Sequence, residues 1–300
     1  MGRMSFPSLL KSAAILIKSR VEPIFIWSWC TAISCLIVGR GFPPIKPVLM
    51  VVFAMICIST SVYLYNDIID KEMDSINPIK QNRPIVSNMV SEKDVMKIIY
   101  LFGFIGLTIT LFLNIYSFIF SFIYLFLFNI YSYPKIRLKT KFLGKEFTIF
   151  LGWLLCSQVA SYAIIGSFSF LALFCAILIG FFAISVIPVF ADSFDIDEDR
   201  LYGVKNLSVL LSWKRKMQLL IFAFFVVMTM TPLTYVQFGF NIVMPIIVVA
   251  MSLIFLRFMF PIVNEFEQIK VMKVKKIARI YFILLQILIA LGSIKFTLFI

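Results

Sequence analysis

The sequence of 300 residues contains no histidine, which excludes histidine-based acid–base catalysis and histidine ligation of a metal. Its five cysteines lie inside apolar segments and form no Cys-x-x-Cys pair. Neither a disulfide framework nor a cysteine metal site is therefore expected, and we interpret the cysteines as small packing residues. Charged residues make up 14% of the chain, whereas a soluble domain is about one quarter charged. This composition is not typical of a soluble protein.

The sequence instead contains long apolar runs. Hydrophobic residues make up 61% of the sequence, the mean hydropathy is +1.00, and several runs are long enough to cross a bilayer. The sequence predicts an all-α fold, a polytopic membrane bundle of nine transmembrane helices. The predicted spans are 23–39, 45–65, 95–113, 115–132, 146–165, 168–191, 217–236, 241–258 and 278–299.

The N-terminal segment 1–22 precedes the first predicted span. Residues 8–20 predict a short basic amphipathic helix lying among lipid headgroups. Residues 1–20 lack the small-residue cleavage site of a signal peptide, so we expect the first span to be retained. We expect residues 1–300 to form a single transmembrane domain.

Charge is distributed unevenly between the two sides of the predicted bundle. Of the 28 Lys and Arg residues, 25 fall on the side of the N-terminus, as do all 15 acidic residues. Only Arg40, Lys46 and Lys295 fall on the other side. The positive-inside rule predicts a cytoplasmic N-terminus and an outside C-terminus. Basic residues that flank membrane spans also explain the net charge of +13, so no nucleic-acid partner is expected.

Two acidic motifs with the same spacing follow two of the predicted spans. The first consists of Asp67, Asp70 and Asp74, and the second of Asp192, Asp195 and Asp199. On a helix, steps of three and four residues return to one face, so each motif projects its carboxylates in one direction. Three such carboxylates repel one another, and neutralising one is not expected to destabilise the metal-free protein. Oxygen ligands of this kind are typical of Mg²⁺ sites.

Cations and aromatic residues accompany both motifs. Lys80 and Arg83 follow the first motif among helix-breaking prolines, and Lys205 follows the second. Tyr131 begins a cationic and aromatic stretch that continues through Lys135 and Arg137 after the fourth span; Tyr65, Tyr133 and Trp153 are further aromatic candidates. Carboxylates surrounded by Lys and Arg suit a diphosphate carried with Mg²⁺, because the metal bridges acids to phosphate oxygens and the cations neutralise the rest.

These residues resemble a known family, the UbiA superfamily of intramembrane prenyltransferases. Asn66 with the first motif, followed by Asn77-Pro78 and Arg83-Pro84, resembles the first signature of that family. The second motif, continued through Lys205, resembles the second signature, and Tyr131-Ser132 resembles a family Tyr-Ser element. The resemblance implies nine helices, with the loops 66–94 and 192–216 forming a catalytic cap on the cytoplasmic side.

The resemblance also implies roles for individual residues. The implied Mg²⁺ ligands are Asn66, Asp67, Asp70 and Asp74 for one ion and Asp192, Asp195 and Asp199 for the other. The implied diphosphate ligands are Lys71, Arg83, Lys135, Arg137 and Lys205, and the implied catalytic residues are Asp70, Asp195 and Tyr131. Asn206 departs from the family pattern, because many members have Thr there.

The implied function is Mg²⁺-dependent transfer of a prenyl group from a prenyl diphosphate to a lipid or aromatic acceptor, of the archaeal-lipid or quinone-precursor type. Membrane lipids are expected partners, and no obligatory protein partner is implied. A terpene cyclase on the same scaffold is an alternative, because ionisation of the donor needs the same metals. A divalent-cation or lipid transporter is a second alternative. A transporter is expected to carry ionisable residues near the bilayer midplane, and the apolar runs contain none.

Overall fold

The computed structural model describes residues 6–77 and 80–294, and within these ranges the chain is helical and contains no strand. The long helices of this part are α2 (Val21–Val38), α3 (Ile45–Ile69), α5 (Glu92–Leu113), α6 (Ile115–Ser132), α7 (Gly144–Ile165), α8 (Phe170–Phe190), α11 (Trp213–Phe238), α12 (Val243–Met259) and α13 (Gln268–Gly292). The short ones are α1 (Phe6–Ser19), α4 (Lys71–Ile76), α9 (Ile196–Leu201) and α10 (Leu207–Leu210), with the 3-10 turns η1 (Leu138–Thr140), η2 (Asp192–Phe194) and η3 (Phe260–Ile262).

Eight helices of the described chain are long and apolar enough to cross a membrane, namely α2, α3, α5, α6, α7, α8, α11 and α12. They coincide with the first eight predicted spans. The ninth predicted span, 278–299, falls within α13, but α13 begins earlier, at Gln268, and its first half carries five cations. Residues 295–299 of that prediction lie outside the described residues. A ninth span is therefore not confirmed.

Polar residues and glycines mark where the apolar helices begin and end. The side chain of Asn114 accepts a hydrogen bond from the backbone nitrogen of Tyr116 at 2.8 Å, so one residue both ends α5 and caps α6. Gly166 ends α7 and Gly239 ends α11, with φ of +67° and +66°. Glycine reaches these angles without the steric cost that a side chain adds. The connections at this end of the helices are short: residue 114 between α5 and α6, residues 166–169 between α7 and α8, and residues 239–242 between α11 and α12.

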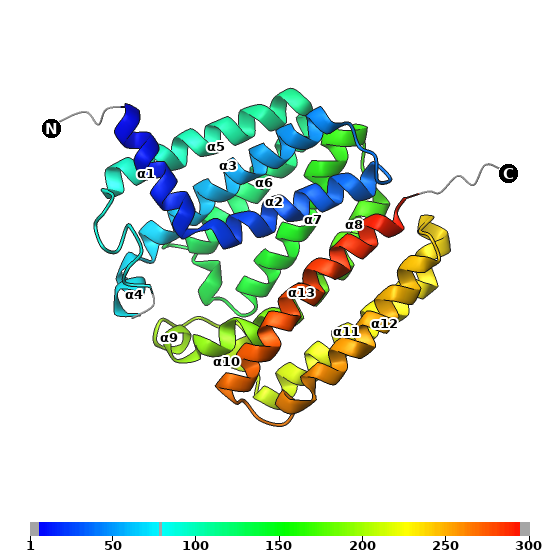
Figure 1. The fold of residues 1–300 in the computed structure, drawn as a ribbon. Coiled ribbons are helices and arrows are strands. Elements are labelled where there is room, and N and C mark those ends of the chain that lie inside the picture. Colours follow the sequence, from blue (N-terminus) through cyan, green and yellow to red (C-terminus); the bar gives the residue numbers. More distant parts are fainter. Residues whose placement is uncertain (1–5, 78–79, 295–300) are drawn as a thin grey trace.

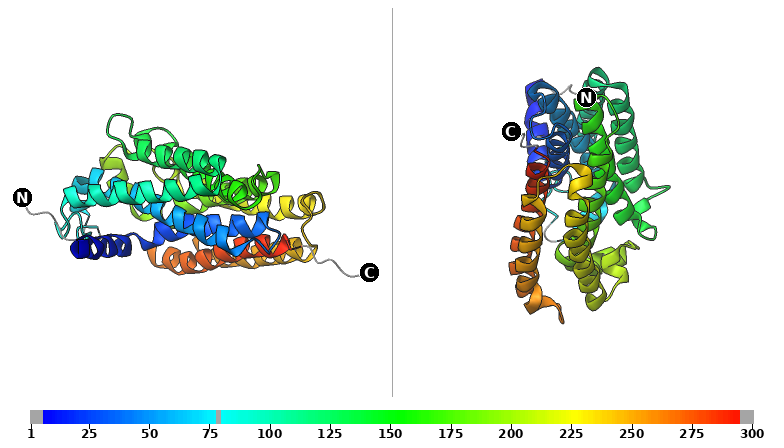
Figure 2. Two further views of the ribbon diagram at one scale, coloured as in Figure 1. Left: turned by 90° about the horizontal axis from the view of Figure 1, so that it is seen from above. Right: turned by 90° about the vertical axis from the view of Figure 1, so that its right-hand side faces the viewer.

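The long helices run along one common direction, while α1 lies across the end of the bundle (Figure 1). Helix α3 packs against α2, α5, α6 and α7, and helix α8 packs against α7 and α11. Seen from two further sides, α2 and the last helix, α13, lie on the same face, where they contact each other (Figure 2). One buried apolar cluster extends from Trp27 of α2 to Ala290 of α13.

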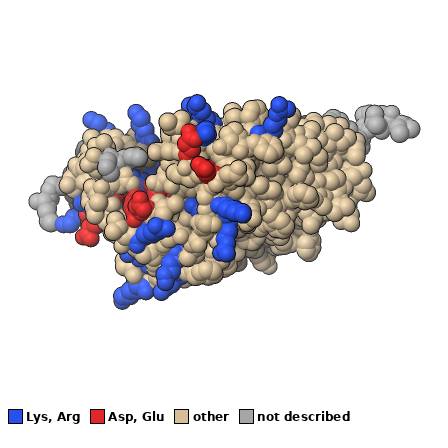
Figure 3. All heavy atoms as spheres, turned by 90° about the horizontal axis from the view of Figure 1, so that it is seen from below, with Lys and Arg blue, Asp and Glu red and all other residues tan. Residues whose placement is uncertain are grey.

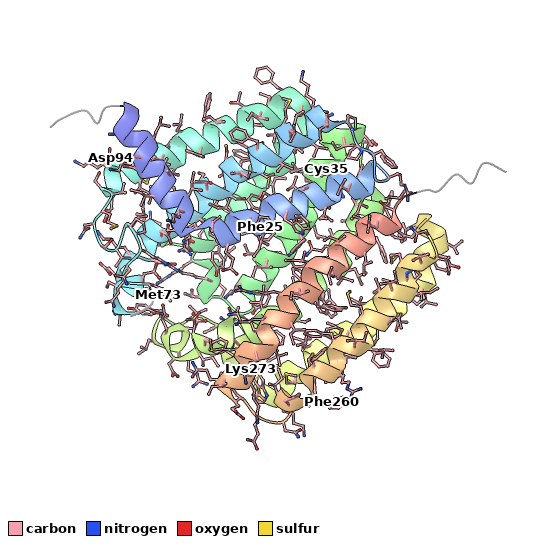
Figure 4. The ribbon with its side chains drawn as sticks, in the orientation of Figure 1. Phe25, Cys35, Met73, Asp94, Phe260 and Lys273 are labelled. Atoms are coloured by element: carbon pink, nitrogen blue, oxygen red, sulfur yellow. The ribbon has the colours of Figure 1, made fainter. Side chains whose placement is uncertain are left out.

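We use the name charged end for the end of the bundle formed by residues 70–77, 80–91, 133–143, 191–212 and 260–267. Helices α4, α9 and α10 gather there (Figure 1). Met73 and Lys273 lie toward this end, whereas Cys35 lies toward the other (Figure 4). Seen from below, Lys, Arg, Asp and Glu side chains cluster over one part of the surface and leave the rest uncharged (Figure 3). Both acidic motifs belong to the charged end.

Candidate active site

The first acidic motif spans the break between α3 and α4, and its carboxylates are buried. The guanidinium of Arg20, just before α2, binds Asp67, with 2.8 Å between Nε and Oδ2. Arg83, from the connection after α4, forms an ion pair with Asp74 and lies 3.5 Å from Asp67. Burial raises the pKa of Asp74, although Arg83 and Arg20 lower it. The motif therefore joins two segments that are distant in sequence.

Asp70 pairs with a third cation, Lys139 of η1. This lysine is only 4% exposed, and its burial lowers the pKa of its ammonium group, partly offset by Asp70. A buried charge is stable only when it is paired, so Lys139 and Asp70 depend on each other. The pair therefore holds the connection between α6 and α7 against the first motif.

The second acidic motif begins where α8 ends. Lys145, in the first turn of α7, donates to Asp192 at 2.7 Å. The amide of Asn206, fully buried, donates to Asp199 at 2.7 Å and to Asp192 at 3.5 Å, while its oxygen caps α10 by accepting from Val209. Burial raises the pKa of Asp199. Asn206, the departure from the family pattern, thus orients two acids of this motif.

Asp195 differs from the other acids of both motifs. Its carboxylate forms no hydrogen bond or ion pair with any described residue. It lies between η2 and α9 and is partly exposed. A free carboxylate at this position is able to accept a ligand without first losing a protein partner.

A cavity of about 150 Å³ lies between α3, α6 and α7. It is lined by Val62, Tyr63 and Asn66 of α3, by Phe128, Tyr131 and Ser132 of α6, and by Lys145, Thr148 and Ile149 of α7. Asn66 precedes the first motif and accepts a hydrogen bond from Ser132 at 2.6 Å. Lys145 belongs to the cavity wall and to the ion pair with Asp192. The cavity therefore reaches the residue before the first motif and the ion-pair partner of the second, and Tyr131 lines it.

The remaining predicted diphosphate ligands are placed differently. Lys71 donates to Asn88 and to Glu92, both at 2.9 Å. Lys135 and Lys205 are exposed. Arg137 is partly buried, and its Nε has no hydrogen-bond partner among the described residues. Of the five predicted cations, the structure brings only Arg83 into contact with an acidic motif.

Three cations that contact the acidic motifs are not among the predicted site residues, namely Arg20, Lys139 and Lys145. In the sequence, Arg20 belongs to the predicted basic membrane-surface helix. Lys139 and Lys145 belong to a basic connection between two spans, where lysine is ordinary. Their burial against carboxylates depends on packing that no local pattern encodes. Of the predicted aromatic residues, Tyr131 lines the cavity, whereas Trp153 is buried in the core.

An ion pair also links the segments that carry the two acidic motifs to each other. Lys80 donates to both oxygens of Glu198 on α9, at 2.8 and 3.0 Å, and the amide of Asn77 donates to the same carboxylate. Both side chains of the ion pair are largely buried. The segment after the first motif and the segment of the second motif are therefore tied together at the charged end.

The donor set suits Mg²⁺ in its chemistry. Carboxylate and amide oxygens from Asn66 and the two motifs are the ligands that this ion prefers. In the described chain, no three of these acids converge closely enough to hold a metal ion. Four of them are paired with a cation, namely with Arg20, Arg83, Lys139 and Lys145. The acids are able to bind Mg²⁺ when these cations pair instead with an anionic ligand that binds together with the ion.

The fold and the site define an integral-membrane helical protein with a polar chamber at one end of its bundle. A model of the UbiA prenyltransferase family matches residues 27–285, so the chain belongs to that family and is a prenyltransferase. The resemblance stated from the sequence motifs is thereby confirmed. A comparison with curated proteins gives no match.

Solved structures show the same fold. The structure of a digeranylgeranylglyceryl phosphate synthase is 23% identical, with a TM-score of 0.70, over 96% of this chain and 99% of that chain. A UbiA homologue from Archaeoglobus fulgidus bound to DMAPP and Mg²⁺ is 15% identical, with a TM-score of 0.65, over 89% and 97% of the two chains. A homologue from Aeropyrum pernix K1 is 16% identical, with a TM-score of 0.65, over 90% and 96%.

Proposed function

We propose that this protein transfers a prenyl group from a prenyl diphosphate to an acceptor and that the transfer depends on Mg²⁺. One observation carries the proposal: Asn66, directly before the first motif, and Lys145, which is paired with Asp192 of the second motif, line the same cavity. A diphosphate at its mouth lies among buried carboxylates and cations. The Archaeoglobus homologue, bound to DMAPP and Mg²⁺, supports this choice of ligand.

We assign the charged residues to diphosphate binding. Arg83, Lys139 and Lys145 leave their carboxylate partners and form charge-assisted hydrogen bonds to phosphate oxygens. When bound, Mg²⁺ neutralises the diphosphate and withdraws electrons from the breaking carbon–oxygen bond. Asn66 and the six acids of the two motifs are the proposed ligands of the metal, with Asp70 and Asp195 central to them.

We assign the aromatic residues of the cavity to the prenyl group. Tyr63, Phe128 and Tyr131 line the cavity. Their ring faces stabilise an allylic cation, and their apolar surface excludes water that otherwise captures it. The predicted ligands Lys71, Lys135, Arg137 and Lys205 remain part of the proposal as an outer set that attracts the anionic donor.

The proposal includes the arrangement in the membrane. We propose a single domain over residues 1–300, with the N-terminus and the cap formed by 66–94 and 192–216 in the cytoplasm. Helix α13 completes nine spans and takes the C-terminus outside. The distribution of Lys and Arg supports this orientation. A lipid or aromatic acceptor reaches the chamber from the bilayer or from its cytoplasmic surface.

Donor affinity tests the proposal. We expect Arg83→Lys to bind a prenyl diphosphate more weakly than wild type, because lysine keeps the charge but loses the two-pronged contact. We expect Arg83→Ala to lose roughly tenfold to a hundredfold in affinity, the value of a hydrogen bond to a charged group. Calorimetry in detergent at fixed Mg²⁺ measures both.

A matched control separates the site from general charge effects. Arg257, at the end of α12, is an exposed cation at the same end of the bundle, and Arg257→Ala is expected to bind as wild type does. Equal affinities of wild type and both Arg83 variants, or no binding by wild type, contradict the proposal. If the protein were a cation transporter, wild type would not bind the diphosphate, because transport of a cation needs none.

A further inference from the structure

A buried lysine next to the second acidic motif has no part in the proposed function. Lys216 lies near the start of α11 and is 3% exposed. Its ammonium group donates to the hydroxyl of Ser193 in η2 at 3.2 Å and to the hydroxyl of Ser208 in α10 at 3.0 Å. Within the described residues, it forms an ion pair with no carboxylate. It therefore differs from Lys139 and Lys145, which pair with acids of the motifs.

The two serines also bind the end of α8. Both hydroxyls donate to the backbone carbonyl of Pro188, Ser193 at 2.6 Å and Ser208 at 3.3 Å. This carbonyl belongs to the last turn of α8, where carbonyls lack partners within the helix. Each hydroxyl has one hydrogen, which it donates to Pro188, so its lone pairs are left to accept from Lys216. All four hydrogen bonds are therefore made at the same time.

The four hydrogen bonds join segments that carry the second motif. Ser193 directly follows Asp192 in the chain. Ser208 lies two residues after Asn206, whose amide donates to Asp199 at 2.7 Å. The acids of the second motif are therefore attached at two places to a serine that the buried lysine binds.

Burial of Lys216 without a counter-charge is unfavourable for stability. A buried charge is costly unless it is paired, and two neutral hydroxyls compensate it less well than a carboxylate does. Asp192 attracts the ammonium group electrostatically but pairs with Lys145 instead. Proteins keep locally unfavourable groups of this kind mainly at functional sites. The contacts of Lys216 indicate that this site is the second motif.

The hydrogen bonds of Lys216 do not depend on the ion pairs of the site. In the proposed function, Lys145 leaves Asp192 for a phosphate oxygen, so Asp192 loses its ion pair when the donor binds. Lys216 binds hydroxyls that are not among the proposed ligands of the metal or the diphosphate, and it lies outside the lining of the cavity. Its contacts therefore remain on the second motif throughout this exchange.

We propose that Lys216 is a positioning residue, which keeps Asp192 and Asp199 in their binding geometry while Lys145 changes its partner. The inference rests on the proposed function and adds to it a residue that touches neither the donor nor the metal. It also gives the start of α11 a role in the reaction, through η2 and α10.

Lys216→Met tests the proposal, because methionine is apolar and similar in size. The variant removes a buried charge, so its unfolding temperature in detergent is expected to equal or exceed that of wild type. Its affinity for a prenyl diphosphate at fixed Mg²⁺ is nevertheless expected to fall roughly tenfold, within the range of couplings between contacting residues. Calorimetry with dimethylallyl, geranyl and geranylgeranyl diphosphate first finds the donor that wild type binds most tightly, and this donor is used for the variants.

Two further variants show whether the hydrogen-bond donors matter or only the charge. Lys216→Arg keeps N–H groups for both serines and is expected to recover most of the affinity that Lys216→Met loses. Lys214→Met removes an exposed cation two residues earlier in α11, and it is expected to bind as wild type does.

Ser193→Ala gives a measurement that does not depend on whether Lys216→Arg folds. In wild type, Ser193→Ala is expected to weaken donor binding, because it removes one of the two contacts of the lysine with the motif. In the Lys216→Met background, the same change is expected to have little further effect, since the contact is already lost.

The outcomes separate this inference from the proposed function. If wild type binds none of the three diphosphates, the proposed function fails and the role of Lys216 fails with it. If wild type binds a donor and Lys216→Met binds it equally well, only the positioning role is overturned. A lowered unfolding temperature of Lys216→Met, together with additive effects of Lys216→Met and Ser193→Ala on affinity, shows a purely structural lysine and overturns the positioning role as well.

Discussion

Asp70 and Asp195 occupy equivalent places in the two acidic motifs, but their surroundings differ. Asp70 pairs with the buried Lys139, whereas Asp195 has no partner among the described residues. We expect Asp70→Asn and Asp195→Asn each to abolish turnover, because each removes a proposed Mg²⁺ ligand. Assays at saturating Mg²⁺ measure this; turnover like that of wild type in both variants contradicts the site.

The same two variants are expected to differ in stability. Repulsion between carboxylates predicts no loss for either, but the structure changes this expectation for Asp70. Asp70→Asn leaves the Lys139 ammonium buried without a counter-charge, which costs about 3–5 kcal/mol in comparable pairs. Asp195→Asn breaks no ion pair and is expected to unfold at the same temperature as wild type. Thermal unfolding in detergent without Mg²⁺ compares them, and a loss of stability only in Asp195→Asn contradicts the pairing.

At the scale of single residues, the sequence predicts acids better than cations. The repeated spacing of Asp67, Asp70 and Asp74 identifies the first motif because a helix translates spacing into direction. No such periodicity identifies Lys139 or Lys145. Each is one lysine in a basic connection, and its burial depends on where the end of α6 meets the start of α7.

At the charged end, the ion pair of Lys80 with Glu198 joins the loop after the first acidic motif to the segment of the second. We expect Glu198→Lys to raise the KM for the donor, because two facing cations push the loops apart. The double variant Glu198→Lys, Lys80→Glu restores opposite charges and is expected to recover most of the loss. Coupling energies between contacting residues are about 0.5–3 kcal/mol, so steady-state kinetics resolves them. A double variant no better than Glu198→Lys contradicts a direct link.

The packing of α2 on α7 depends on Gly152. Gly152→Ala places a methyl group 2.5 Å from Trp27, and overpacking of this kind costs about 1–3 kcal/mol. We expect a lower unfolding temperature in detergent. Gly103→Ala is the control, because its methyl group meets the side chain of Ser61 at 3.2 Å and nothing closer. Equal unfolding temperatures of the two variants contradict the close approach.

The sequence predicts the helices of this protein well where an apolar run is long enough to cross a bilayer. Eight predicted spans match helices because uninterrupted apolar runs have few other structures open to them. The exception is α13, whose basic first half extends from Gln268 to Arg279. Hydropathy detects the apolar half and overlooks the rest. That basic half reaches the second motif, where Lys275 lies 5.1 Å from the ring centre of Phe194.

The orientation of the whole molecule follows from charge, and labelling tests it. The five native cysteines are buried, so they give little background reaction with a thiol reagent. Ser75 on α4 and Lys205 after α9 are exposed at the charged end, and Ser167, between α7 and α8, is exposed at the opposite end. One cysteine is introduced at each of these positions.

In intact cells, an impermeant maleimide is expected to label Ser167→Cys and to leave Ser75→Cys and Lys205→Cys unlabelled. After the membrane is permeabilised, all three are expected to react, which shows that shielding came from the bilayer and not from folding. The physical reason is the confinement of 25 of the 28 Lys and Arg residues, and of every acid, to the proposed cytoplasmic side. Labelling of Ser75→Cys and Lys205→Cys, but not Ser167→Cys, in intact cells places the chamber outside and reverses the proposed orientation.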